Sequence, residues 1–303
     1  MLRGCLRAVL AQEAVELEVI VVDDGSTDGT QKLIADLSDS RLRVIRHDQP
    51  RGVAESRNAG IAAATGSWIA FTDDDDLWAP SKLCEQLSAA DSNGAAFTYC
   101  GAVVFSDNSE LVTPDRPVPS PEVMRSTIVR WNPLPGGASA QMARRDLLLD
   151  VGGFDTSLHF LADWDLWIRL TDAAAMAAVD KALVAYRRHS ANMVLGHSKG
   201  HLEEFSRLVA KHGETARRRG LAFDGVGFNY WIANGQRRAG RRWSATRIHF
   251  TAAVKYRDVG HLGSAIRSPL GDWALGMRSG TPCRPEPPPA WLRELRTLNK
   301  LRQ

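Results

Sequence analysis

The sequence lacks a run of apolar residues long enough to cross a membrane as a helix. Its longest uninterrupted apolar stretch extends from Ala173 to Val179, whereas a membrane-spanning helix needs about 20 such residues. The charged, apolar and small-residue pattern of a secretory signal is also absent from the first residues. Both absences predict a cytoplasmic protein.

Cysteine is scarce and follows no pattern. The four cysteines, Cys5, Cys84, Cys100 and Cys283, have neither the spacing of metal ligands nor that of a disulfide framework. We therefore expect buried free thiols, none of them catalytic.

Motifs of two other enzyme classes are missing. No Gly-x-Gly-x-x-Gly turn follows a predicted strand, which argues against a dinucleotide-dependent dehydrogenase. No Asp-x-Asp-x-Thr motif follows the first predicted strand, which argues against a phosphotransferase that forms an aspartyl phosphate. The phosphotransferase stays an alternative, because acidic residues at strand ends also hold Mg²⁺.

Charge is distributed unevenly along the 303 residues. The segment from Met1 to Val194 has 18 Lys and Arg against 27 Asp and Glu, whereas Leu195 to Gln303 has 20 against 8. The hydrophobic content of 44% is enough for one large packed domain with an appendage. The basic segment predicts attraction to anionic lipid headgroups, and a merely solvated helical tail is the alternative. We expect no nucleic-acid partner.

Two apolar strands of the sequence end abruptly in carboxylates. Residues 19–22 lead into Asp23 and Asp24, and residues 68–72 lead into the run Asp73 to Asp76. In an open α/β sheet, ligands bind at the carboxyl ends of the strands. Crowded carboxylates repel one another, and Mg²⁺ or Mn²⁺ is a suitable partner because these ions bridge carboxylates to phosphates. Taken separately, the first run is also typical of a turn, and the second of a solvated loop or a helix N-cap.

Strand and helix patterns alternate along the first half of the chain. The alternation predicts a parallel sheet covered by helices on both faces, and after His189 the pattern becomes mostly helical and Arg-rich. A Pro-rich linker from Pro282 to Pro289 and an amphipathic basic tail from Trp291 to Leu301 follow. The expected strands are residues 17–23, 42–45, 67–71 and 95–105, with another short strand after Ser139. The expected helices are residues 2–10, a helix capped by Thr27 or Asp28, and residues 52–64, 80–90, 144–150 and 163–170.

Four segments, in this order, resemble the glycosyltransferases of family 2. They are Glu18 to Thr30, Arg51 to Gly60, Phe71 to Trp78, and Gly152 to Trp167. The resemblance extends over roughly Leu2 to Met193. It implies the GT-A fold, an α/β fold in which a mixed sheet flanked by helices binds a nucleotide sugar, here followed by a mostly helical C-terminal extension.

The domain boundaries follow from this resemblance and from the change in composition. We expect a GT-A-like catalytic domain over residues 1–194, a helical basic region over 195–281, and a linker with its tail over 282–303. Family members begin with an apolar strand and a Pro-x-Tyr-Asn-like turn before the helix that starts here at Leu2, and this chain lacks both. Either the true start lies upstream of Met1 or the protein has lost its first strand. We favour the first, since a lost central strand would leave backbone groups of its neighbours unpaired.

The resemblance implies a donor site at the first acidic strand end. In the family this strand end holds the base and ribose of the nucleotide, which assigns these roles to Asp23 and Asp24, with Asp24 at the base edge. Arg57 resembles the basic residue that reaches the nucleotide, and an ordinary helix-face position is its alternative. Gly136 and Gly137 resemble a glycine-bearing loop whose backbone approaches donor or acceptor.

The family's Asp-x-Asp motif falls on Asp73, Asp74 and Asp75. The resemblance implies that Asp75 binds Mn²⁺ or Mg²⁺, that Asp73 contacts the ribose or a metal-bound water, and that Asp74 adjoins the donor. Asp76 is expected to cap a helix or to accept a hydrogen bond behind the site. His189 resembles a late histidine that adds a metal or phosphate contact, and a structural role is its alternative.

The same resemblance implies a general base. In the family this base is the Asp of a Glu-Asp pair that heads a helix, and here the pair reads Ala162-Asp163. Asp163 is thus expected to take the proton of the acceptor hydroxyl. Its alternative is a plain N-cap for the helix that follows.

Together these features predict a metal-dependent, inverting glycosyltransferase. It would move a sugar from a nucleotide-diphospho-sugar to a hydroxyl of a glycan or lipid-linked acceptor, in polysaccharide biosynthesis for the cell envelope. We expect it in the cytoplasm, peripheral on the inner face of the membrane through its basic C-terminal region. The alternative from a different class is a truncated, catalytically impaired relative that serves as a binding or scaffold subunit.

Overall fold

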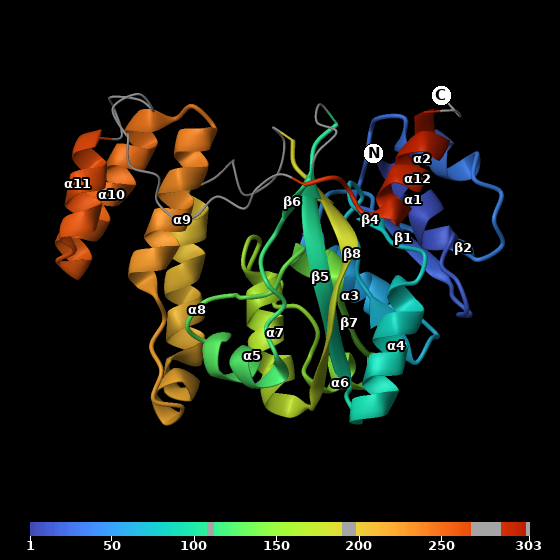
Figure 1. Ribbon diagram of the computed structural model, residues 1–303, viewed down its shortest axis with the longest axis horizontal. Helices are drawn as coiled ribbons and strands as arrows, with labels where there is room; N and C mark the ends of the chain where they lie inside the picture. Colours follow the sequence, from blue (N-terminus) through green and yellow to red (C-terminus); the bar gives the residue numbers. More distant parts are fainter. Residues whose placement is uncertain (108–111, 190–197, 268–285, 301–303) are drawn as a thin grey trace. The chain divides into compact units, whose positions relative to one another are not determined.

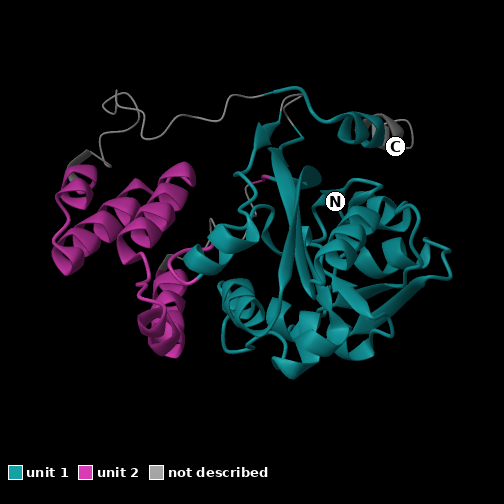
Figure 2. Cartoon of the chain, turned by 60° about the horizontal axis from the view of Figure 1, so that its bottom comes forward, with its two compact units in different colours: residues 1–128, 133–187, 285–303 teal, residues 129–132, 188–284 magenta. Residues whose placement is uncertain are grey.

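A computed structural model describes residues 1–107, 112–189, 198–267 and 286–300 of the chain (Figure 1). The chain forms two compact units (Figure 2). Unit 1 comprises residues 1–128, 133–187 and 285–303, and unit 2 comprises residues 129–132 and 188–284.

Unit 1 contains two β-sheets among its described residues. The smaller sheet pairs β1 (Val19–Asp23) with β2 (Leu42–Arg46) in parallel. In the larger sheet β5 and β8 are parallel neighbours, and the other pairs are antiparallel. The predicted mixed sheet is therefore confirmed, whereas the all-parallel sheet suggested by the alternation is wrong. The larger sheet has the order β3 (Trp68–Ala70), β7 (Gln141–Arg144), β5 (Phe97–Phe105), β8 (Met176–Arg187) and β4 (Leu77–Trp78), with β6 (Thr113–Pro114) paired to β5.

Most helices of unit 1 lie close to the predicted positions, whereas α5 and a short 3-10 helix were not predicted. The α2 helix has Gly29 as its N-cap, and the Asp28 carboxylate accepts a hydrogen bond from the backbone of Thr30 at 3.0 Å. The helices are α1 (Leu2–Leu10), α2 (Thr30–Ala35), α3 (Val53–Ala63), α4 (Lys82–Asn93), α5 (Pro121–Thr127), a short 3-10 helix (Gly137–Ala140), α6 (Arg145–Asp150), α7 (Ala162–Ala173) and α12 (Ala290–Lys300).

The core of unit 1 lies around β5, whose nine residues are all buried. Phe97 of this strand stacks on Trp167 of α7 with ring centroids 5.5 Å apart. Phe71 meets Phe154 edge to face at 5.2 Å. These ring contacts fix α7 and the segment before it against the sheet, close to the end of β3.

The α1 helix packs its apolar face on the core through Cys5, Leu6 and Val9. Cys5 and Cys100 are buried free thiols, as predicted, and Cys84 is a free thiol that is partly buried. Cys283 lies outside the described residues.

One edge of β1 and one edge of β3 have no strand partner within the described part of unit 1. There β1 pairs with β2 alone, and β3 pairs with β7 alone. The two strands that end in carboxylates therefore belong to separate sheets. The prediction that a first strand is missing stays a prediction.

The α12 helix at the end of the chain belongs to unit 1 (Figure 2). Leu292 is fully buried in a core cluster against which Trp291 and Leu295 also pack. The Trp291 indole donates a hydrogen bond to the carbonyl of Ala182 at 3.1 Å. The apolar face of the amphipathic tail is therefore packed inside the unit rather than exposed.

Unit 2 is helical in its described residues, as its sequence predicted. Its helices are α8 (Ser198–Arg218), α9 (Gly225–Arg238), α10 (Arg242–Tyr256) and α11 (Val259–Arg267). Phe205 and Phe228 stack with centroids 4.2 Å apart and join α8 to α9. Within the residues that the structure describes, no helix of either unit is long and apolar enough to span a membrane.

Candidate functional site

Asp23 lies at the carboxyl end of β1 and is 4% exposed. It accepts a hydrogen bond from the backbone N–H of Ser26 at 2.8 Å and forms an ion pair with Arg46 of β2. Burial acts to raise the pKa of this carboxyl, but the hydrogen bonds from Ser26 and the charge of Arg46 bring it below its usual value. Asp23 and Arg46 also line a pocket of about 360 Å³ formed by β1, α2 and β2, whose other walls are largely apolar.

Asp24 is held by three donors from the segment that precedes α3. One carboxylate oxygen accepts from His47 Nδ1 and from the backbone of Arg51, and the other accepts from the backbone of Gly52, all at 2.8 Å. Gly52 has a φ of +95°, a conformation that its missing side chain permits. This carboxylate therefore fastens the chain before α3 to the end of β1, and its role at a base edge stays a prediction.

Asp73 begins the acidic loop after β3 and is paired with Arg57. The guanidinium of Arg57, on α3, donates to the Asp73 carboxylate at 2.6 Å. The backbone N–H of Asp73 donates to Ser139 Oγ at 3.0 Å. Arg57 also lies over the ring of Phe154, 5.3 Å from its centroid. Two predicted donor-binding residues, one on α3 and one after β3, are thus brought together.

Asp76 supports the acidic loop from behind. It is fully buried, accepts a hydrogen bond from Ser139 Oγ at 2.5 Å and another from the backbone of Arg187 at 2.9 Å. The Arg187 side chain donates to the carbonyl of Asp75 at 2.8 Å. Burial, followed by the charge of Asp73, raises the pKa of Asp76 to about 8. The expected hydrogen-bond role of Asp76 is thus present, with partners that the sequence did not indicate.

The loop concentrates carboxylates that a cation would stabilise. Burial raises the pKa of Asp74, and the charges of Asp75 and Asp73 add to this effect. No group of three or more His, Cys, Asp or Glu residues in the described part of the chain is placed to hold a metal ion. The acidic loop nevertheless fits a site in which one or two carboxylates bind Mn²⁺ or Mg²⁺ together with substrate phosphates. His189, two residues beyond the end of β8, is half-buried.

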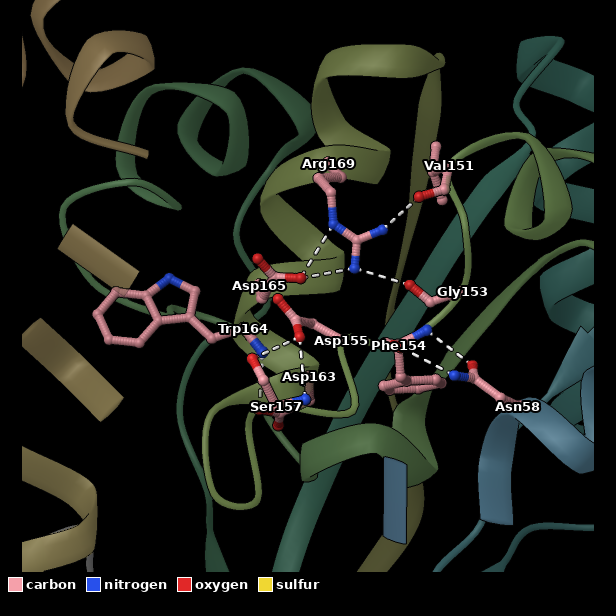
Figure 3. Close-up of polar contacts among 10 residues, drawn as sticks. All are labelled: Asn58, Val151, Gly153, Phe154, Asp155, Ser157, Asp163, Trp164, Asp165 and Arg169. Carbon is pink, nitrogen blue, oxygen red and sulfur yellow. Dashed lines mark hydrogen bonds and ion pairs between the residues drawn. The ribbon is translucent and has the colours of Figure 1, made fainter. Parts of the chain in front are cut away.

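Asp163 lies in the first turn of α7, where Leu161 is the N-cap. Its carboxylate accepts a hydrogen bond from the backbone of Trp164 at 2.7 Å (Figure 3). Burial raises the pKa of Asp163, the charge of Arg57 opposes this effect, and the charge of Asp73 adds to it. Asp163 therefore shares one electrostatic environment with the Arg57–Asp73 pair, although it lies about ninety residues further along the chain.

The segment before α7 is held by two side-chain clamps (Figure 3). The Asn58 amide accepts from the backbone N–H of Phe154 and donates to its carbonyl, both at 2.8 Å. Arg169 pairs with the buried Asp165 at 2.6 Å and donates to the carbonyls of Val151 and Gly153 at 2.6 and 2.7 Å. Asn58 thus fixes the backbone near the Arg57–Phe154 contact.

Gly136 and Gly137 form the turn that enters the 3-10 helix. Both have positive φ, 66° and 54°. The backbone N–H of Gly136 donates to Asp115 at 2.8 Å, and a Cβ there would lie 2.9 Å from the Cβ of Ala102. This turn positions Ser139 against Asp73 and Asp76, while any contact of the two glycines with donor or acceptor stays a prediction.

A sequence profile described as Glycosyl transferase family 2 matches residues 1–155, which is more than half of the chain. The chain belongs to this family. Among curated members, it is 43% identical over 110 residues to the succinoglycan biosynthesis protein ExoO of Rhizobium meliloti, covering 36% of this chain and 30% of that protein. It is 35% identical over 104 residues to the Escherichia coli UDP-Glc:alpha-D-GlcNAc-diphosphoundecaprenol beta-1,3-glucosyltransferase WfgD, covering 34% and 41%.

Solved structures of glycosyltransferases share the fold of this family 2 chain. Staphylococcus aureus TarS 1–349 in complex with UDP-GlcNAc aligns with a TM-score of 0.59 at 18% identity, covering 88% of this chain and 77% of that one. The mannosyltransferase PcManGT of Pyrobaculum calidifontis, in complex with GDP-Man and Mn²⁺, aligns with a TM-score of 0.51 at 17% identity, covering 99% and 76%. The predicted GT-A fold is confirmed. The chain spans less than half the length of ExoO and of WfgD.

Three of the residues that organise this family 2 site gave no signal in the sequence. Ser139 contacts residues more than 60 positions away, and Arg187 reaches residues more than 110 positions away. His47 follows β2 directly, and no sequence pattern marks it as a partner of Asp24. No local pattern marks such contacts, because they arise only when the strands assemble.

Proposed function

We propose that the chain is an inverting glycosyltransferase that uses a nucleotide-diphospho-sugar and a divalent metal. The observation that carries this proposal is the Arg57–Asp73 ion pair at the end of β3, whose two charges act on the carboxyl of Asp163 at the start of α7. Burial raises the pKa of the Asp163 carboxyl, and a carboxylate with a raised pKa is a stronger base toward an acceptor hydroxyl.

The donor is proposed to lie along the two acidic strand ends. The nucleoside would lie near Asp23 and Asp24, and the apolar pocket beside Asp23 supports a planar base there. The diphosphate would reach the acidic loop, where Asp75 and Asp73 would hold Mn²⁺ or Mg²⁺ and His189 would add a contact. A bound ion would neutralise charge on the departing diphosphate. The Mn²⁺ in the PcManGT complex supports a divalent ion in a protein of this fold.

Arg57 would change its partner in the course of donor binding. In the structure its guanidinium neutralises Asp73, and a metal ion near Asp73 would take over that role. The guanidinium, once freed from Asp73, would be able to bind donor phosphates through two parallel hydrogen bonds. Asp74 would stay at the rim of this site.

The reaction itself is proposed to proceed by a single displacement. An acceptor hydroxyl attacks the anomeric carbon, the bond from that carbon to the diphosphate oxygen breaks, and its electron pair leaves with the diphosphate. Asp163 takes the hydroxyl proton. Attack on the face opposite the leaving group inverts the anomeric carbon.

The acceptor class is proposed from relatives. WfgD is named as acting on a diphosphoundecaprenol-linked sugar and ExoO as a succinoglycan biosynthesis protein. These names support a hydroxyl of a lipid-linked or polymeric glycan in cell-envelope polysaccharide synthesis. The basic charge of residues 195–281 supports a peripheral location at the inner membrane surface.

The test is metal-dependent binding of nucleotide sugars, followed by turnover. Purified protein is screened for thermal stabilisation by UDP- and GDP-sugars with and without Mn²⁺, since a ligand that binds only the native state raises its stability. We expect stabilisation that needs the metal, and its loss in Asp75→Ala. Asp91→Asn, an exposed carboxylate on α4, is the matched control and should behave as wild type.

Equal stabilisation with and without metal, or in Asp75→Ala, would contradict the assignment of Asp75. Metal-dependent binding without transfer to any hydroxyl acceptor would instead favour the binding or scaffold subunit. Asp163→Asn separates these outcomes further, because it should retain donor binding and lose transfer by about 100-fold or more.

A further inference from the structure

The outward face of α10 in unit 2 carries large apolar side chains. Trp243 is 74% exposed, Phe250 is 57% exposed and Val254 is 67% exposed. Their spacings of seven and four residues place them on one side of the helix. We call Trp243, Phe250 and Val254 the outer stripe of α10.

The opposite side of α10 carries the side chains that pack into the core of unit 2. Ala245, Ile248 and Ala252 are buried there. The outer stripe therefore does not contribute to the described core. The α12 helix differs from α10 in this respect, because its apolar side chains Trp291 and Leu292 pack inside unit 1.

Cations surround the outer stripe. Arg247 is exposed and lies four residues after Trp243, on the same face of the helix. Lys255 and Arg257 are exposed at the end of the helix. Residues 225–267 contain eight Lys and Arg and a single acidic residue, Asp258, whose carboxylate accepts a hydrogen bond from the backbone of His261 at 2.7 Å.

The neighbouring helix also carries exposed apolar side chains. Val259 at the start of α11 is 85% exposed, and Leu262 is 45% exposed. An aromatic and aliphatic stripe bordered by arginine and lysine has the composition of a helix that lies in the interface of an anionic bilayer.

We propose that the outer stripe of α10, with Arg247, Lys255 and Arg257, docks on an anionic membrane surface. Trp243 and Phe250 enter the boundary between headgroups and acyl chains, and the cations contact lipid phosphates. The helix lies in the plane of the interface and does not span it. This inference rests on the proposed membrane location and identifies the part of the protein that contacts the membrane. It does not depend on the assignment of any catalytic residue.

The cations beside the outer stripe favour a membrane over a second copy of the chain as the partner of this surface. A second copy would bring the same cations against the outer stripe, and like charges that face each other are repelled. An apolar protein partner would gain nothing from Arg247 in the middle of the stripe. An anionic lipid surface satisfies the apolar and the charged side chains together.

The test measures binding of the full chain to vesicles. Vesicles of phosphatidylcholine alone are compared with vesicles of equal parts phosphatidylcholine and phosphatidylglycerol, by sedimentation. We expect binding to the anionic vesicles that weakens with salt. The double variant Trp243→Ser/Phe250→Ser should bind about tenfold more weakly or worse, because two large apolar side chains no longer enter the bilayer.

The matched control is Val123→Ser/Leu149→Ser. These two side chains are 48% and 47% exposed on unit 1, so the control removes exposed apolar side chains from another part of the protein and should bind as wild type. Arg247→Gln/Lys255→Gln should weaken binding to anionic vesicles several-fold and reduce its salt dependence. Circular dichroism and melting temperature establish that each variant is folded.

A second readout locates the contact. Brominated lipids quench tryptophan fluorescence at the depth of the acyl chains, and the quenching should fall when Trp243→Phe replaces the wild type. Equal vesicle binding by wild type and Trp243→Ser/Phe250→Ser would overturn the proposal. Absence of binding to anionic vesicles would also overturn it, as would self-association that disappears in the double variant, which would assign the stripe to a second copy.

The outcome is distinct from that of the transferase test. Vesicle binding is measured without donor, metal or acceptor, so an inactive protein would still dock. Conversely, a variant that fails to dock should retain metal-dependent stabilisation by nucleotide sugars. Failure of one proposal therefore leaves the other standing.

Discussion

At the scale of single residues, one guanidinium controls the charge of the proposed active site. Arg57 pairs with Asp73 at 2.6 Å and lowers the pKa of Asp163, which burial raises. Arg57 itself is held against the ring of Phe154. Any change at this residue should therefore affect the protonation of the base as well as donor binding.

The first prediction concerns the pH profile of transfer. The proposed base must be ionised, so kcat/KM should fall as the pH decreases through the raised pKa of Asp163. Arg57→Gln removes a charge that favours the carboxylate and should move this acid limb to higher pH. Arg41→Gln, an exposed arginine paired with Asp39, should leave the limb in place. An acid limb that does not move in Arg57→Gln would show that another group titrates.

The residues of the site differ in how far the sequence could predict them. Asp73 and Asp163 follow family motifs, and the structure brings them into one electrostatic environment. Ser139 is also fully buried and joins Asp73 to Asp76, but a serine in a glycine-rich turn has no distinctive pattern. Its position is set by the pairing of β7 with β3 and β5, which is a tertiary property.

At the scale of secondary-structure elements, the turn between α6 and α7 is held by Asn58. Gly152 and Gly153 both have positive φ, 80° and 65°. A Cβ on Gly153 would lie 2.5 Å from the Asn58 amide oxygen, whereas a Cβ on Gly152 would meet nothing within 4 Å. Asn58 cannot move away without losing its two hydrogen bonds to Phe154.

The second prediction uses these two glycines as a matched pair. Gly152→Ala should lower the free energy of unfolding by about 1 kcal/mol, the cost of a left-handed conformation for a residue with a Cβ. Gly153→Ala should cost roughly 2 kcal/mol more, because the hydrogen bonds between Asn58 and Phe154 are strained or lost. Urea unfolding of both variants measures the difference. Equal values would mean that Asn58 gives way freely and does not hold the turn.

Most of the elements were predictable from the sequence. The patterns indicated most of the helices and the strands β1, β2, β3, β5 and β7, but not α5, β4, β6 or β8. The β8 strand has exposed Asp180 and Lys181 in its middle, next to an irregularity in its pairing with β5 near Gly101. The β4 strand has only two residues. The alternation of apolar and polar residues cannot reveal a strand whose pattern is interrupted, nor a strand of only two residues.

At the scale of the whole molecule, the two units have separate cores with different responses to pH. In unit 2, His249 Nδ1 and His261 Nδ1 lie 2.8 Å apart, and both rings are buried. His261 Nε2 donates to the carbonyl of Val226 at 3.1 Å, so its Nδ1 accepts the proton of His249 Nδ1. Burial, with the charges of His261 and Arg237, lowers the pKa of His249 to about 4.

The last prediction is a loss of stability in acid that originates in unit 2. The unfolded chain binds a proton at His249 below its ordinary pKa of 6.5, whereas the folded chain does so only near 4. The folded state binds fewer protons in this window, so its stability decreases as the pH falls from about 6.5 to 4, by roughly 3 kcal/mol. Urea unfolding followed by circular dichroism at pH 7.5 and 4.5 should show this decrease.

His249→Asn keeps an N–H toward His261 and does not titrate, so its stability should depend less on pH. His159→Asn, an exposed histidine of unit 1, is the control and should retain the wild-type dependence; if His249→Asn retained it too, the acid response would belong to other groups.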